Sequence, residues 1–179
     1  MVKSAYSFAT KKEKVESHII VVWVDNESGV LARVVGLFSG RGYNIDSLAV
    51  AEVDKKKNIS RITIATSGTP QVLQQIKLQL GKLVPVHKVA DFPQNKKTLM
   101  REMALLKIIS SKTQLEKAKK LCKKYKHTLL DRTEKSFVLE VSALKKEIDE
   151  LIKKLQPLGL ASVSRTGVVA MTKGPEIYK

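Results

Sequence analysis

The order of apolar patterns constrains the fold of this chain most, because one succession of strand and helix signals occurs twice. Residues 18–24 (HIIVVWV) form an apolar run of β-branched, strand-like residues, typical of a strand buried on both faces. The apolar period then becomes that of a helix. The first succession is a strand at 18–24, a helix with Val30, Leu31, Val34, Val35 and Phe38 on one face, strands at 44–53 and 60–66, a helix from Thr69, and a strand at 86–92.

Local signals indicate where these elements begin and end. Gly40 and Gly42 end the first helix, because glycine commonly follows the last helical residue. Residues 60–66 (SRITIAT) alternate polar and apolar positions, which predicts a half-exposed antiparallel strand. Thr69-Pro70 supplies a capping residue followed by proline, which favours a helix start.

The same succession returns after residue 97. Ser111 to Gln114 form a plausible capping box, and Cys122 falls on the inner face of the helix that follows. We therefore expect Cys122 to lie in a core. The second succession is a strand at 103–109, a helix with Leu115, Ala118, Cys122 and Tyr125 inward, strands at 127–131 and 137–141, a helix capped by Ser142 with Leu144, Ile148, Leu151, Ile152 and Leu155 inward, and a strand at 160–171.

These patterns predict an α+β protein of two tandem ferredoxin-like βαββαβ units. Each unit would be an antiparallel four-stranded sheet with two helices on one face. We expect a disordered tail at 1–17, a first domain at 18–92, a linker at 93–98 and a second domain at 99–179.

Composition narrows the setting of the protein. The longest apolar run, 19–24, is far shorter than the ~20 residues that a membrane-spanning helix needs. The N-terminal segment has no apolar centre, so it does not look like a secretory signal. One cysteine excludes an internal disulfide framework, and we expect a cytoplasmic protein, with the plastid stroma possible. Of the net charge of +16, +11 falls within 93–179, which is either a solvated lysine surface or a face for an acidic protein partner.

Several classes of chemistry find little support in the sequence. The three histidines and Cys122 are scattered over different elements, whereas zinc needs clustered ligands. No triad or pair of carboxylates stands out, so we expect no catalysis and no metal. A basic βαββαβ protein can bind RNA by stacking bases on aromatic residues, but SRITIAT in the first unit has none, and FVLEV in the second unit has only Phe137.

The start of the first helix is the most informative candidate site. Gly36, Gly40 and Gly42 lie within or after that helix, so they do not form a phosphate loop. Ahead of it, Asn26 and Gly29 lie where backbone N–H groups lack partners and a carboxylate can bind. An amide oxygen of Asn26 can accept from an ammonium group, so the segment suits an amino acid. On residue chemistry alone, a plain helix cap by Asn26 or Ser28 is the simpler interpretation.

Longer motifs resemble a known family. NESGVLARVVGLFSGRGYNIDSLAVA, SRITIAT and KLVPVHKV, with REMALLKI and SRTGVVAM in the second unit, closely resemble the regulatory small subunit of acetolactate synthase (acetohydroxyacid synthase). The resemblance covers about residues 18–179. It implies an N-terminal ACT domain that binds a branched-chain amino acid, usually valine, and a second ferredoxin-like domain.

The resemblance also implies partners and site residues. It implies a homodimer through the ACT domains, a catalytic large subunit that is activated and made sensitive to feedback inhibition, and no nucleic acid or membrane. Thiamine diphosphate, Mg and FAD are expected only on the large subunit, and this chain needs no cofactor. The alternatives are an amino-acid-sensing ACT module of another enzyme or a basic RNA-binding protein. Implied effector contacts are Asn26, Gly29, Val30 and Leu31, with Asn44 and Ile45 from the neighbouring chain; Ala32, where the family often has serine, and Ala51 lie near the pocket.

Overall fold

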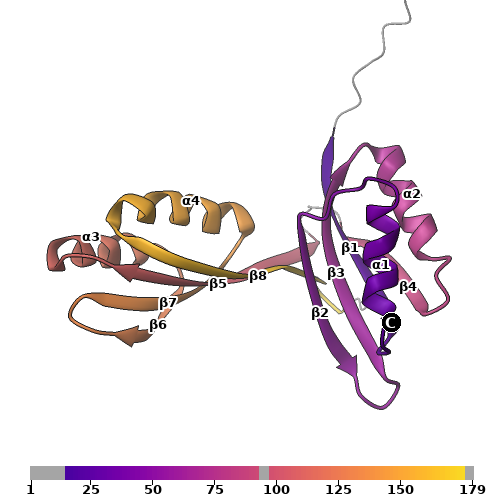
Figure 1. Ribbon diagram of the computed structural model, residues 1–179, viewed down its shortest axis with the longest axis horizontal. Helices are drawn as coiled ribbons and strands as arrows, with labels where there is room; N and C mark the ends of the chain where they lie inside the picture. Colours follow the sequence, from indigo (N-terminus) through magenta and orange to yellow (C-terminus); the bar gives the residue numbers. More distant parts are fainter. Residues whose placement is uncertain (1–14, 93–96, 176–179) are drawn as a thin grey trace, which may run out of the picture.

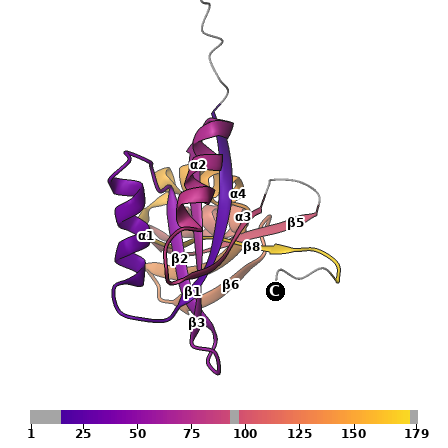
Figure 2. The same ribbon diagram turned by 90° about the vertical axis from the view of Figure 1, so that its right-hand side faces the viewer.

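The computed structural model describes residues 15–92 and 97–175 of this 179-residue chain. Most of the expected tail (1–14) and of the expected linker (93–96) therefore lies outside the described residues. The described chain forms two units side by side, each a sheet covered by two helices (Figures 1 and 2). No helix among these residues is long and apolar enough to cross a membrane.

The first unit is built from the first βαββαβ succession. Its sheet is antiparallel with the strand order β2-β3-β1-β4, and both helices cover one face (Figure 1). The elements are β1 (Glu16–Asp25), α1 (Val30–Ser39), β2 (Ser47–Asp54), β3 (Ile59–Gly68), α2 (Pro70–Leu80) and β4 (Val86–Phe92).

The second unit repeats this topology, with the strand order β6-β7-β5-β8. The expected fold class of two ferredoxin-like units is therefore confirmed. The elements of the second unit are β5 (Thr98–Ile109), α3 (Lys112–Cys122), β6 (His127–Arg132), β7 (Ser136–Ala143), α4 (Lys145–Leu155), a short 3-10 turn (Gln156–Leu158) and β8 (Leu160–Thr172).

The first core corrects one part of the sequence interpretation. The inner stripe of α1 consists of Val30, Val34, Leu37 and Phe38, whereas Leu31 and Val35 are exposed. Each residue of a helix turns by about 100°, so positions 31 and 35 lie beside the stripe that faces the sheet. The apolar face expected from the sequence is therefore buried only in part.

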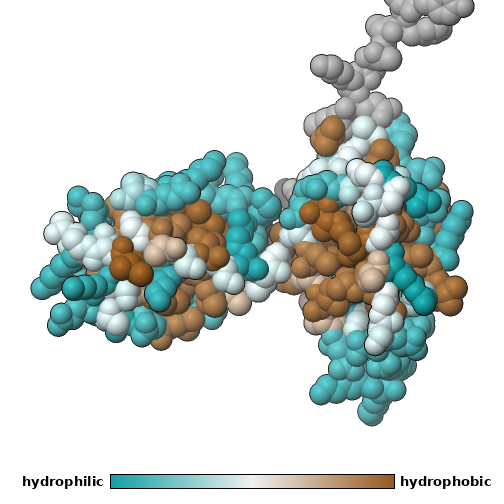
Figure 3. Space-filling view, viewed as in Figure 1, coloured by the Kyte–Doolittle hydropathy of each residue, from teal (hydrophilic) through white to brown (hydrophobic). Residues whose placement is uncertain are grey.

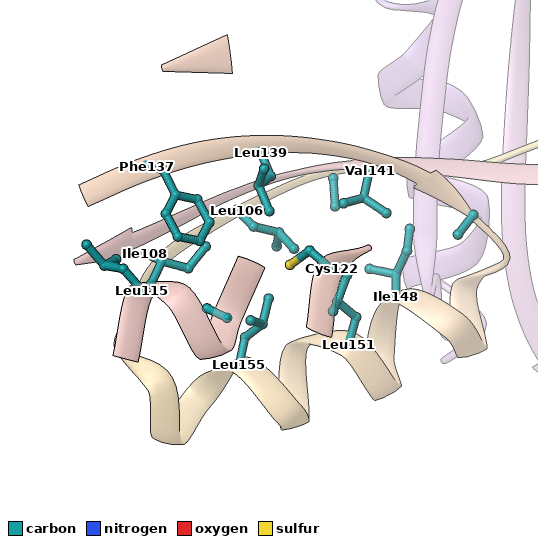
Figure 4. Packing of buried hydrophobic residues seen from close by; sticks show 13 residues of the cluster. Leu106, Ile108, Leu115, Cys122, Phe137, Leu139, Val141, Ile148, Leu151 and Leu155 are labelled. Atoms are coloured by element: carbon teal, nitrogen blue, oxygen red, sulfur yellow. The ribbon is translucent and has the colours of Figure 1, made fainter. Parts of the chain in front are cut away.

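The second core is packed between its sheet and the helices α3 and α4 (Figure 4). Cys122 is fully buried there, as expected, and burial raises the pKa of its thiol to about 11. Ser142 does not cap α4, because β7 continues through Ala143 and Leu144 is the N-cap residue. Leu144 is consequently exposed rather than part of the inner stripe. The core contains Leu106, Ile108, Leu115, Phe137, Leu139, Ile148, Leu151 and Leu155.

The strand β3 was expected to be half exposed and is instead buried on both faces. Ile62 and Ile64 face the helices, but Thr63 and Ala65 on the opposite face are only 4% exposed. The reason is a second layer over that face: β5 and β8 extend beyond their own sheet as a two-stranded ribbon that reaches the first unit (Figure 1).

An apolar contact joins the ribbon to the first sheet. Val168 and Ala170 of β8 share a buried cluster with residues of β1, β3 and β4, among them Val21. At its margin, the guanidinium of Arg61 lies 5.4 Å from the ring centroid of Trp23 and donates to the backbone oxygen of Ala170. The helices α1 and α2 thus bury one face of β1 and β3, and the contact with the β5–β8 ribbon buries the other face.

Candidate effector-binding site

The segment before α1 is fixed at its backbone by two neighbouring turns. The N–H of Asp25 donates to the Pro85 oxygen at 2.9 Å, and the N–H of Asn26 donates to the Asn58 oxygen at 2.8 Å. The carboxylate of Asp25 also lies 2.6 Å from Nε2 of His87. These bonds hold the start of α1 between the β2–β3 turn and the loop that precedes β4.

Gly29 leaves the first turn of α1 open. It is the N-cap residue, with φ +83°, and it has no side chain to bond the free N–H groups. A Cβ placed on Gly29 would find no atom within 4 Å, so the space beside it is empty. The N–H groups of Leu31 and Ala32 are at the positions that have no partner within a helix. The segment therefore offers donors to an anion.

A plain helix cap by Asn26 or Ser28 is not what the structure shows, because no side chain caps α1. Oδ1 of Asn26 instead lies 3.0 Å from the hydroxyl of Ser60, which donates to it. The Asn26 backbone oxygen accepts from Nδ2 of Asn58 at 3.3 Å. Asn26 is thus held toward β3, and its side-chain oxygen keeps a second lone pair for a ligand.

The other group of expected contacts lies in the connection between α1 and β2. The strand β2 begins at Ser47, three residues later than expected, because Asn44 to Asp46 bond to β3 through other groups. The Asn44 backbone oxygen accepts from the Thr66 hydroxyl at 2.6 Å, and the N–H of Asp46 donates to the Ala65 oxygen at 2.8 Å. Nδ2 of Asn44 donates to Oδ1 of Asp46 at 2.6 Å.

A single chain does not bring the two groups of residues together. Asn26 and Gly29 precede α1 and Asn44 follows it, and a ten-residue helix is about 15 Å long. That separation is too large for one amino acid to bridge. Of the other expected contacts, Val30 is buried in the core and can offer its backbone, Ile45 packs at the edge of the same core, and Leu31, Ala32 and Ala51 are exposed.

Apolar side chains flank these groups on the outside of the first unit. Within the described chain, β2 is an edge strand whose only hydrogen-bonded partner in the sheet is β3. Val50 on β2 is 45% exposed, and Leu31 and Val35 of α1 are 41% and 36% exposed. Figure 3 shows hydrophobic residues gathered on this side of the unit. An edge strand beside an apolar helix face is a surface suited to pairing with another protein chain.

Three residues that support the site carry little signal in the sequence. Ser60, Thr66 and Asp46 hold the two asparagines through side-chain hydrogen bonds. Ser60 and Thr66 are polar residues inside a strand and are at most 5% exposed. Their only signal in the sequence is that two hydroxyl residues bracket the apolar centre of SRITIAT.

The structure offers little to the other classes of function. Residues 15–92 and 97–175 hold no group of three or more histidine, cysteine, aspartate or glutamate side chains that could bind a metal ion. The open sheet face on which an RNA-recognition motif stacks bases is covered in the first unit by the β5–β8 ribbon. Phe137 in the second unit is fully buried on the helix side of the sheet.

Comparisons with known proteins identify the family. The family model described as the AHAS small subunit-like ACT domain matches residues 20–88, and the model described as the small subunit of acetolactate synthase matches residues 101–174. The acetolactate synthase isozyme 3 small subunit of Salmonella typhimurium is 37% identical over 162 residues, covering 90% of this chain and 98% of that protein. The chain belongs to the acetolactate synthase small-subunit family.

Other members of the family are similar to this chain over most of their length. The acetolactate synthase small subunit of Aquifex aeolicus is 35% identical, covering 91% of this chain and 84% of its own. The crystal structure of the small subunit from Thermotoga maritima superposes with a TM-score of 0.81 at 29% identity, covering 90% of this chain and 99% of that one. This chain is accordingly a regulatory small subunit, partnered with the catalytic large subunit of acetolactate synthase, to which the activity belongs.

Proposed function

We propose that the ACT unit of this small subunit binds a branched-chain amino acid, with valine the expected effector, at the interface between two copies of the chain. The observation that carries the proposal is the separation of the two half-sites. Asn26 and Gly29 lie at one end of α1, and Asn44 lies beyond the other. Two α1 helices packed antiparallel about a two-fold axis would place each half beside its complement.

The exposed surface of the first unit supports such a dimer. The β2 edge can extend the sheet into the partner, and Leu31, Val35 and Val50 supply apolar area beside it. In a two-fold interface the same patch meets itself, so one self-complementary surface builds two equivalent sites. Ala32 follows Leu31 and Ile45 follows Asn44 in the chain, so both would border the ligand, and Ala51 is proposed to lie near the pocket.

The chemistry of each half suits one end of an amino acid. The carboxylate would accept from the N–H groups around Gly29 to Leu31 at the start of α1, where the helix dipole favours negative charge. The N–H groups of Leu31 and Ala32 are the main donors, because that of Val30 already donates to the Glu27 oxygen at 3.4 Å. The ammonium group would donate to the side-chain oxygens of Asn26 and of the partner's Asn44. Apolar contacts with the branched side chain would complete the selection.

Binding between two chains provides a route to regulation. A ligand that favours one dimer arrangement changes how the dimer holds the large subunit, and we propose that this produces activation without the effector and feedback inhibition with it. If the effector changes the affinity of the dimer for the large subunit, thermodynamic linkage requires the large subunit to change the affinity for the effector by the same factor. The corresponding coupling free energy is typically ~1–3 kcal/mol. Titrating the purified chain with valine, leucine and isoleucine, with and without the large subunit, measures both the effector and the coupling.

Two variants at one position test the carboxylate half. Gly29→Asp places a negative charge beside the expected carboxylate, whereas Gly29→Asn adds a side chain of the same size without charge. Position 29 has a positive φ, which aspartate and asparagine both tolerate better than other side chains. We expect the holoenzyme with Gly29→Asp to need at least about tenfold more valine for half-maximal inhibition, because the new carboxylate repels that of the ligand. The variant should still activate the large subunit.

The asparagine variant is the matched control for backbone strain and for size. Gly29→Asn should lose much less valine sensitivity than Gly29→Asp. Equal, normal valine sensitivity in both variants, each folded and still activating the large subunit, would show that the carboxylate does not bind at the start of α1.

A further inference from the structure

We propose that Asp46 is a positioning residue that fixes the polarity of the amine half of the effector site. It turns the amide of Asn44 so that its oxygen faces the ligand. The site would thereby select 2-amino acids over the 2-oxo acids that carry the same side chain. This inference rests on the proposed function, because it concerns the site formed by Asn44 across the dimer.

The contact between Asn44 and Asp46 decides which way the amide points. The two ends of an asparagine amide have nearly the same shape, so their orientation follows from the partners. An ionised carboxylate only accepts hydrogen bonds. The end of Asn44 that lies 2.6 Å from Oδ1 of Asp46 is therefore the NH₂ group. The carbonyl oxygen then points away from Asp46 and is available to accept.

Asp46 is itself held in place by β3. Its other carboxylate oxygen accepts from the hydroxyl of Ser67 at 2.8 Å, and its N–H donates to the Ala65 backbone oxygen at 2.8 Å. The backbone of Asn44 is tied to the same strand through the hydroxyl of Thr66. The Asn44–Asp46 pair thus has both its backbone and its side chains fixed before any ligand arrives, which lowers the entropic cost of binding.

The charge of Asp46 adds to the preference for an amine. Among the described residues, Asp46 forms no ion pair, and its side-chain partners are a neutral amide and a neutral hydroxyl. The charged side chains that line the hollows beside Asp46 are Lys145, Lys146, Asp149, Glu102 and Arg165. Lys145 pairs with Asp149 at 3.0 Å, and Arg165 pairs with Glu102 and Asp149 at 2.6 Å. Asp46 therefore places a negative charge beside Asn44 that no direct ion pair neutralises, and an ammonium group bound at Asn44 would lie in its field.

A 2-oxo acid could not donate hydrogen bonds to this half-site. It keeps the carboxylate and the branched side chain, but a carbonyl oxygen replaces the three donors of the ammonium group. That oxygen would face the oxygen of Asn44 and leave both acceptors without a donor. A site built to hydrogen-bond one group strongly rejects an analogue that lacks it. We expect the wild-type chain to bind valine at least about 100-fold more tightly than the 2-oxo acid of the same side chain.

Such selectivity gives the site a defined place in metabolism. A 2-oxo acid and the amino acid made from it by amination share one carbon skeleton. A sensor that requires the amine responds to the product that follows amination and ignores its precursor.

Calorimetric titration of the full chain tests the role of Asp46. The ligands are valine and the 2-oxo acid of the same side chain. Asp46→Asn can donate as well as accept, so it no longer dictates the orientation of Asn44. We expect its preference for valine over the oxo acid to fall at least about tenfold, through weaker valine binding. Asp46→Glu keeps the charge and should retain most of the preference.

A control variant separates local from general effects of charge. Asp131→Asn makes the same change of charge on the exposed strand β6 of the second unit, and it should leave the ratio of affinities unchanged. Asp46 is exposed, so Asp46→Asn should fold like the wild type, which circular dichroism and thermal denaturation check.

The outcomes distinguish this inference from the proposed function. If Asp46→Asn binds valine and the oxo acid with the wild-type ratio, Asp46 does not set the polarity, while the effector site itself stands. If the wild-type chain binds both ligands equally, the site does not select 2-amino acids over 2-oxo acids, and the inference is wrong. If it binds neither, the proposed function fails and this inference fails with it.

Discussion

At the scale of single residues, the site depends on groups whose role the residue type does not reveal. A glycine before a helix is compatible with a tight turn, with an ordinary cap or with a ligand that approaches the backbone. The φ of +83° at Gly29, the empty space beside it and the absence of a side-chain cap on α1 favour the last. The direction of the Asn44 amide likewise follows from Asp46 and not from Asn44 itself.

The buried thiol of Cys122 predicts a specific dependence of stability on pH. Burial raises the thiol pKa to about 11, so the unfolded chain loses this proton at a lower pH than the folded chain does. The stabilisation is complete below the unfolded pKa and is lost as the pH rises through the folded value. Between about pH 8 and 11, the unfolding free energy of the wild type should fall by about 2 kcal/mol relative to Cys122→Ala.

Urea denaturation of both proteins across this pH range measures the difference. The comparison cancels the titration of the lysines, which both chains share. A constant difference in unfolding free energy from pH 8 to 11 would mean that the thiol is not shielded from water in the folded chain.

At the scale of elements, the sequence predicted which elements form but not every face they bury. The periodicity of α1 was correct, yet Leu31 and Val35 sit beside the inner stripe, because the width of an apolar face depends on what covers it. The alternation in SRITIAT predicted that one face of β3 is exposed to solvent, but the β5–β8 ribbon covers that face. Ser142 resembles a helix cap, but the pairing of β7 with β5 extends past it. Tertiary contacts decided each of these cases.

The turn that leads into β8 contains a glycine that no other residue replaces easily. Gly159 has φ +94°, and a Cβ there would lie 2.4 Å from the backbone oxygen of Ile109. The Gly159 oxygen also accepts from the N–H of Ile109 at 2.9 Å. We expect Gly159→Ala to lower the unfolding free energy by about 3 kcal/mol, because the left-handed backbone strain and the collision add.

Gly174→Ala is the matched control for Gly159→Ala. Gly174 also has a positive φ, +78°, but a Cβ there meets nothing within 4 Å. Its cost in chemical denaturation should be only about 1 kcal/mol, the strain alone. Equal costs at both positions would show that the turn relaxes away from the collision.

At the scale of the whole molecule, the β5–β8 ribbon joins the two units. Val168 and Ala170 cover the sheet face of the first unit that its helices leave open, and Arg61 spans the margin of the contact. Burial lowers the pKa of Arg61, which still stacks on Trp23. The second unit therefore reaches the start of β2, where Ser47 accepts from the N–H of Val168 at 3.4 Å, close in sequence to the proposed contact Asn44.

A charge inside this contact should separate the units without unfolding them. Val168 is 6% exposed, and Val168→Asp would bury a carboxylate among apolar side chains at a cost of several kcal/mol, roughly 3 or more. Each unit keeps its own core, so we expect a larger radius of gyration in X-ray scattering and two separate thermal transitions. The neighbouring Val169 is 49% exposed, and Val169→Asp should change neither. An unchanged scattering curve for Val168→Asp would show that the contact does not hold the units together.

The central claim is that each effector site takes residues from two chains, and mixing two defective variants tests it most directly. Gly29→Asp homodimers lack every carboxylate half, and Asn44→Ala homodimers lack every amine half, so neither should bind valine well. In a refolded equimolar mixture, each mixed dimer contains one intact site. Calorimetry should therefore recover wild-type affinity at about a quarter of the wild-type capacity. No recovery of valine binding in a mixture shown to contain mixed dimers would contradict a site shared between chains.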